Sequence, residues 1–204
     1  MSFEGGPISC RMFYLRHSMP RDALARFAAR LAPPLKDLGS GQIHGWIGGR
    51  HLLDRAIDET SATYAGYLRL TLLVAERKIP EALLRAECRM EELAQMQASG
   101  QAEAPRKLRG EIRQQVTERL LPTMPPQLKG MTLVHEPKSA VLYAEALSDK
   151  QLDAFAVSFR EALGFGAIPV NPLTAAAQRL QLDLRDLPGT SFSPECPDAE
   201  ASNS

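Results

Sequence analysis

Leucines occupy every second position between Tyr67 and Leu73. Leu68, Leu70 and Leu72 alternate with tyrosine, arginine and threonine. A period of two predicts a β-strand with one buried face, because successive side chains of a strand point to opposite sides of the sheet. The chain must therefore build a sheet and cover one side of it.

Two helical patterns follow this strand directly. Residues 81–97 carry Leu83, Ala86, Met90 and Leu93 on one stripe, and residues 105–121 carry an apolar residue at every fourth position, at Leu108, Ile112, Val116 and Leu120. Ser99-Gly100 and a short polar segment separate the patterns, which predicts an antiparallel helical hairpin. Pro122, Pro125 and Pro126 end the second helix and predict an exposed loop as far as Gly130.

The remaining segments predict a mixed order of strands and helices. Apolar periodicity and capping residues favour a strand at 10–16, a helix from Pro20 to Leu31, a β-hairpin formed by 131–135 and 140–144, a helix at 148–163 and a weaker helix at 172–182. The glycines between Gly39 and Gly49 predict a loop or an irregular strand, with a turn that seats Trp46. This order predicts an α+β fold, an antiparallel sheet with packed helices and a protruding helical hairpin. We assign 1–182 to that region, with 81–130 as a subdomain, and 183–204 to a disordered acidic tail.

Overall charge and apolar content exclude several classes of protein. The 204 residues contain 24 basic and 24 acidic side chains, so the totals indicate no polyanionic partner. No apolar run reaches the roughly 18–20 residues that span a bilayer, and no membrane partner is expected. The N-terminus lacks a secretory pattern, and the three cysteines are odd in number and far apart. These features predict a cytoplasmic protein.

The residues that usually carry catalysis are scattered. His44 and His51 flank a glycine-rich segment without cysteines or carboxylates at metal-ligand spacing. The segment 45–50 lacks the Lys-Ser/Thr pair of a phosphate-binding loop, and no nucleophile elbow occurs. We therefore expect no enzyme, no catalytic residues, no metal and no cofactor.

Positive charge gathers in one stretch of the chain. Between Ala104 and Gly130 there are six basic residues and two acidic ones, and Arg106, Arg109 and Arg113 share one helical face. Such a face can neutralise phosphates without reading bases, or it can be an ordinary solvated surface. No aromatic residues interleave with these basic residues, so stacking on single-stranded bases has little support.

Several short motifs occur in a recognisable order between residues 10 and 172. They are Met12–Leu15, Gly45–His51, Ala75–Pro80, Leu120–Pro122 and Pro169–Pro172. In this order the chain resembles the recombination-associated RdgC family. The resemblance implies an α+β protein that forms ring-shaped homodimers, binds double-stranded DNA without sequence preference, and restrains a recombinase.

From the charge pattern and this resemblance we expect a short, non-enzymatic, nucleoid-associated member that binds duplex DNA weakly through phosphate contacts. The residues selected for DNA binding are Arg77, Lys78, Arg106, Lys107, Arg109, Arg113, Arg119 and Lys129. A gate or partner loop is expected at Leu121, Pro122, Met124 and Pro125. The alternative is a protein-interaction module that keeps the fold without DNA binding and uses this loop as its contact.

Overall fold

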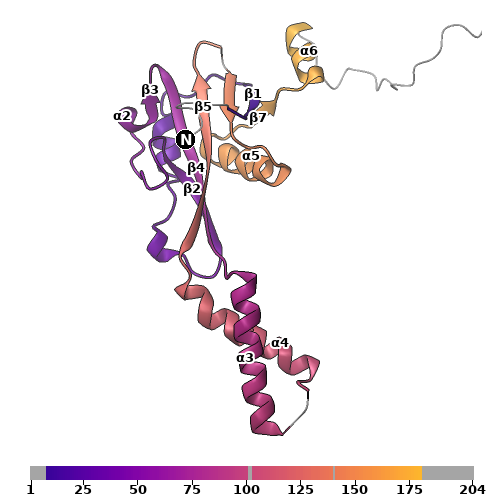
Figure 1. Ribbon diagram of the computed structural model, residues 1–204. Helices are drawn as coiled ribbons and strands as arrows, with labels where there is room; N and C mark the ends of the chain where they lie inside the picture. The colour runs from indigo at the N-terminus through magenta and orange to yellow at the C-terminus, as the bar shows by residue number, and fades with distance from the viewer. Residues whose placement is uncertain (1–7, 101–102, 140, 181–204) are drawn as a thin grey trace, which may run out of the picture. The chain divides into compact units, whose positions relative to one another are not determined.

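The computed structural model describes residues 8–100, 103–139 and 141–180 (Figure 1). The chain divides into one compact unit that ends at Ile168 and another that begins at Pro169. The described part of the first unit combines an antiparallel sheet with helices, which confirms the predicted α+β class. The predicted acidic tail, residues 183–204, lies outside the described residues.

The sheet follows the order β2-β4-β5-β6-β1-β7, with β3 paired to β4. Adjacent strands pair antiparallel from β2 through β1, and β5 and β6 form the predicted β-hairpin. The strands are β1 (Arg11–Leu15), β2 (Gln42–Gly48), β3 (Thr63–Tyr64), β4 (Tyr67–Arg77), β5 (Pro126–Glu136), β6 (Val141–Ala144) and β7 (Ala167–Pro169).

The loop predicted after the second helix is shorter than expected. A 3-10 turn, η3 (Leu121–Thr123), ends the helix, and β5 then begins at Pro126. The register runs from Arg77 opposite Pro126 to Leu68 opposite His135. The prediction of a loop as far as Gly130 is wrong because proline is tolerated as the first residue of a strand.

The predicted loop between Gly39 and Gly49 is mainly a regular strand. All of β2 pairs with β4, and Trp46 lies opposite Leu72. On the other edge of β2, the Ala32 N–H donates to the Trp46 carbonyl at 2.9 Å, and the Trp46 N–H donates to the Arg30 carbonyl at 2.9 Å. Gly45 faces this crossing backbone: a Cβ atom there would lie 2.6 Å from the Ala32 nitrogen. The glycine permits a close approach of two backbones rather than a turn.

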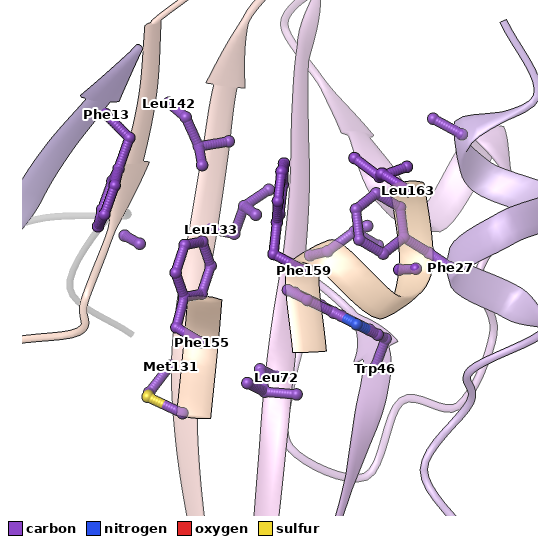
Figure 2. Close-up of a cluster of buried hydrophobic side chains, with 14 of the residues drawn as sticks. Phe13, Phe27, Trp46, Leu72, Met131, Leu133, Leu142, Phe155, Phe159 and Leu163 are labelled. Carbon is purple, nitrogen blue, oxygen red and sulfur yellow. The ribbon is translucent and has the colours of Figure 1, made fainter. Parts of the chain in front are cut away.

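Aromatic side chains fill the main core between the sheet and two helices, α1 (Ala23–Ala28) and α5 (Asp149–Leu163) (Figure 2). The Phe27 ring lies 4.7 Å from the Trp46 ring, and Phe155 lies 5.3 Å from Phe13. The Trp46 indole N–H donates to the Ser158 carbonyl at 3.4 Å. Trp46 therefore anchors the buried face of the sheet instead of a turn.

The middle of β4 is buried on both faces. Leu70 and Leu72 join the main core, while Leu73 packs with Ile47 and Leu52 on the opposite side. Arg69 and Thr71, expected on an exposed face, are 8% and 2% exposed. The prediction of a single buried face is wrong here, because the segment after β2 returns over the sheet and covers its second face.

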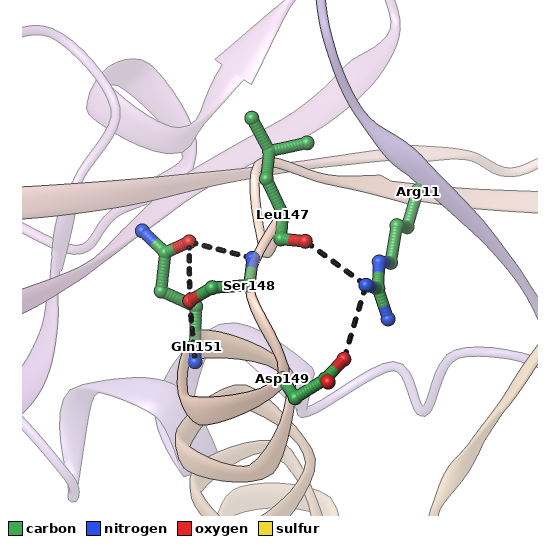
Figure 3. Close-up of polar contacts among 5 residues, drawn as sticks. All are labelled: Arg11, Leu147, Ser148, Asp149 and Gln151. Carbon is green, nitrogen blue, oxygen red and sulfur yellow. Dashed lines mark hydrogen bonds and ion pairs between the residues drawn. The ribbon is translucent and has the colours of Figure 1, made fainter.

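The helix predicted at 148–163 is confirmed as α5, and capping interactions at both ends explain where it begins and ends. The Ser148 hydroxyl accepts from the Gln151 N–H at 3.2 Å, and the Gln151 side chain accepts from the Ser148 N–H at 3.0 Å (Figure 3). Arg11 of β1 donates to the Leu147 carbonyl at 2.9 Å and to Asp149 at 3.3 Å. Gly164 ends the helix with φ of 83°, a conformation that favours glycine.

The two helices predicted between β4 and β5 are confirmed as α3 (Glu81–Ser99) and α4 (Arg106–Leu120). Ile112 and Val116 of α4 are buried against Leu84, with Leu108 and Leu120 beside them. The row predicted on α4 is therefore confirmed.

The row predicted on α3 is wrong. Leu83, Met90 and Leu93 are 36%, 67% and 42% exposed, because α4 covers the neighbouring stripe of Leu84 and Cys88. One partner helix covers only one of the two apolar stripes that α3 carries. We refer to Leu83, Met90 and Leu93 as the α3 apolar row.

Short elements complete the described chain. They are η2 (Leu35–Asp37), α2 (Glu59–Ala62) and, in the second unit, α6 (Pro172–Leu180). The α6 helix confirms the helical pattern after Pro172 over the described residues. At its start, Asn171 and Thr174 exchange backbone-to-side-chain hydrogen bonds, each 2.8 Å long.

Candidate nucleic-acid interface

The basic residues predicted to bind DNA lie in two parts of the structure. Five lie on α4, and three lie at the base of the helix pair, where β4 and β5 end and begin. On α4, Arg106, Arg109 and Arg113 are all exposed and share the face expected from their spacing. This is the group of predicted cations that the structure brings together.

Carboxylates of α3 and α4 pair with Arg113 and with two other predicted cations of α4. Arg119 lies 2.9 Å from Glu87, and Arg113 lies 3.6 Å from Glu81 across the two helices. Lys107 pairs with Glu111 at 3.9 Å along α4. Within the described ranges, no ion pair involves Arg106 or Arg109, which leaves these two guanidinium groups available to an external phosphate.

These ion pairs reduce the effective positive charge of the segment between Ala104 and Gly130. The surplus is real along the sequence, but glutamates of α3 offset part of it in space. Exposed ion pairs contribute at most about 1 kcal/mol each. Arg113 can therefore exchange Glu81 for a phosphate at small cost.

The cations at the base already have partners within the chain. The Arg77 guanidinium donates to the Met124 carbonyl and, at 3.4 Å, to the Leu38 carbonyl. Lys78 and Lys129 both pair with Glu76, at 2.9 Å and 3.4 Å. The hydrogen bond from Lys78, followed by that from Lys129, lowers the pKa of Glu76. Arg77 thus ties three segments of the chain together.

The proline-rich loop also lies at this base. Leu121 and Met124 are half-buried, while Pro122 and Pro125 are exposed. Leu121 and Pro122 border a groove of ≈ 600 Å³, together with the segment 36–40 and Arg77. The loop is therefore positioned where the sheet meets the helix pair.

Two further arginines, Arg85 and Arg89 of α3, were missed by the sequence reasoning. With Arg109 and Arg113 they line a groove of ≈ 540 Å³ between the two helices. Their spacing of four residues places them on one face of α3. That spacing was the available signal, but it does not tell which stripe of α3 faces α4.

The histidines and cysteines are placed separately. His17, His44 and His51 are exposed, whereas His135 is buried in β5 and its burial lowers its pKa. Burial, followed by the charge of Glu145, raises the pKa of Cys10. Over residues 8–100, 103–139 and 141–180, no three His, Cys, Asp or Glu side chains form a group that could hold a metal ion. None of the helices in these ranges has the length and apolar character to cross a membrane.

Comparison with known proteins gives a match to a family model. The model of a family described as "RdgC: Putative exonuclease, RdgC" matches residues 40–182. This range includes the helix pair, β2 and the aromatic helix α5. A search of curated proteins found no match.

Proposed function

The chain belongs to the RdgC family, and from this membership we propose that it is a recombination-associated protein that binds duplex DNA without sequence preference. The observation that carries the proposal is the exposed face of Arg106, Arg109 and Arg113 on α4. Guanidinium groups bind phosphates through planar, bidentate hydrogen bonds. Three of them in a row can contact successive phosphates of a backbone, and contacts to phosphate carry no sequence information.

Weak binding follows from the ion pairs around this face. Arg113 already forms an ion pair with Glu81, and Lys107 forms one with Glu111. Contacts of DNA with Arg113 and Lys107 replace these existing ion pairs, so the net gain is smaller than the number of cations suggests. Association with the nucleoid and restraint of a recombinase belong to the same proposal.

The test is the fluorescence anisotropy of a labelled duplex of about 30 base pairs across a salt series. For duplex DNA, the logarithm of affinity falls with the logarithm of salt concentration by about 0.9 per neutralised phosphate. Reversal of Arg106, Arg109 and Arg113 to glutamate is expected to abolish binding. Reversal of Arg21, Arg30 and Lys150, which are exposed elsewhere, is the control with the same change in net charge.

Unchanged affinity in the α4 variant would refute this face as the binding surface. Loss of binding in both triple variants would show that net charge, rather than this face, governs the interaction. Circular dichroism of each variant verifies that the helices remain folded.

We further propose that binding occurs without cleavage. The side chains on the α4 face are guanidinium groups, which hold phosphates but do not activate water at neutral pH. The measurement is gel analysis of an end-labelled duplex incubated with the protein and Mg²⁺ or Mn²⁺. Full-length strands are expected, and progressive shortening that co-purifies with the protein would overturn this part of the proposal.

A protein-interaction role is the second candidate, and the α3 apolar row favours it. Leu83, Met90 and Leu93 leave a helix face uncovered, and exposed apolar patches often mark interfaces. We propose that a second copy of the chain covers this row, since the family resemblance implies dimers. Sedimentation velocity is expected to show a dimer that Met90→Glu dissociates, whereas a wild-type monomer at micromolar concentration would overturn the assignment.

A further inference from the structure

We propose that the groove between α3 and α4 holds one strand of the DNA backbone, an inference that rests on the proposed DNA binding. Two residues from each helix supply its cations: Arg85 and Arg89 from α3, and Arg109 and Arg113 from α4. Ala86 and Cys88 lie between them on α3. The site therefore depends on the packing of the two helices and not on α4 alone.

The charges that face the groove remain positive after its acidic residues are counted. Glu92 lies 3.2 Å from Arg89, and Glu81 lies 4.0 Å from Arg85 and 3.6 Å from Arg113. Two glutamates thus oppose four arginines. The pairs of Glu81 with Arg85 and Arg113 are exposed and stabilise little, so a phosphate can displace this carboxylate from the two guanidinium groups. The Glu92 side chain beside Arg89 is only 16% exposed.

The shape and lining of the groove suit a sugar–phosphate chain. Its volume of ≈ 540 Å³ lies within the range of ligand-binding clefts. All four cations are arginines, whose forked donors match phosphate oxygens better than lysine does. Ala86 and the half-buried Cys88 give the lining apolar surface, against which the carbon face of a deoxyribose can pack.

Arg106 lies outside the groove lining but on the same face of α4 as Arg109 and Arg113. A strand that enters the groove can therefore continue along α4 toward Arg106. This places Arg85 and Arg89 beside the proposed binding face and adds two phosphate contacts that the α4 row alone does not provide.

The first test removes the two α3 cations. In Arg85→Ala, Arg89→Ala protein, the salt dependence of duplex binding is expected to be less steep than wild type by about 1.8, which is two contacts at about 0.9 each. Arg21→Ala, Lys150→Ala protein is the matched control, with the same loss of charge at exposed positions outside the groove. A slope equal to wild type in the α3 variant would overturn the groove site.

The second test uses wild-type protein and needs no variant to fold. Cys88 lines the groove, whereas Cys10 lies just before β1 and outside that lining. Mass spectrometry is used to follow alkylation by N-ethylmaleimide, a neutral reagent, at each cysteine. Saturating duplex is expected to slow modification of Cys88 and leave that of Cys10 unchanged. Equal rates at Cys88 with and without bound DNA would overturn the groove site.

The two proposals fail in different ways. If wild type binds the duplex but Cys88 is not protected or the slope is unchanged, the groove site is wrong and DNA binding stands. If wild type shows no binding at low salt, the proposed function is wrong, and the groove site fails with it.

Discussion

Substitution of Gly45 by alanine tests the account of β2 as a strand crossed by a second backbone. A Cβ atom at this position would lie 2.6 Å from the Ala32 nitrogen and 3.0 Å from the Leu31 carbonyl carbon. Ordinary contacts between non-bonded heavy atoms lie at about 3.5–4.0 Å. Because the opposing atoms belong to the backbone, no side-chain rotation can relieve the overlap.

The loss of stability depends on whether segment 30–32 moves away from β2. If segment 30–32 separates from β2, two backbone hydrogen bonds are lost, at about 0.5–1.5 kcal/mol each. If the segment stays, overpacking costs about 1–3 kcal/mol. We therefore expect a loss of about 1–3 kcal/mol, which lowers the melting temperature by about 2–12 °C for a chain of this size.

The assay is urea and thermal unfolding followed by circular dichroism. Gly41→Ala is the matched control, because a Cβ atom there meets nothing within 4 Å. The control is expected to unfold within about 0.5 kcal/mol of wild type, as surface substitutions usually do. Equal unfolding midpoints for the two variants would refute the close approach at Gly45.

Two other side chains give predictions about stability. Burial lowers the folded-state pKa of His135, so the unfolded chain binds the proton more tightly and stability falls as pH drops below about 6.5. Urea unfolding midpoints at several pH values are expected to lose part of this pH dependence in His135→Leu but not in the control His44→Gln. An unchanged pH dependence in His135→Leu would contradict the reasoning. Arg77→Ala removes the two hydrogen bonds to backbone carbonyls and is expected to lower the free energy of unfolding in urea by about 1.5–3 kcal/mol. The control Lys78→Ala is expected to lower it by less than about 1 kcal/mol. Equal losses would show that Arg77 does not hold the base of the helix pair.

Local signals account for the parts of the fold that could be predicted. The ends of α5 are set by Ser148 and Gly164, each of which acts on the backbone within a few residues. The buried row of α4 follows from a spacing of four. The residues that define these elements lie within or next to them, so the sequence was sufficient to predict them.

The errors arise where a distant segment decides the outcome. The glycines around Trp46 look like a loop, but Gly45 accommodates the backbone near Ala32. The α3 apolar row has the spacing of a core stripe, yet α4 covers its neighbour. Arg106, Arg109 and Arg113 share a face of α4 because their spacing is local. Glu81 and Glu87, the partners of Arg113 and Arg119, lie on another helix and could not be assigned from the sequence.

The chain leaves the sheet before α3 and returns to it after α4 at two residues that pair with each other, and we call the intervening segment the excursion. Arg77 ends β4 and lies opposite Pro126, which begins β5, so the whole excursion occupies the place of a β-turn. A change in the length or composition of the excursion leaves the ladder between β4 and β5 in the same register. The sheet and the helix pair can therefore diverge at different rates during evolution, one preserving a scaffold while the other adapts its reach and charge.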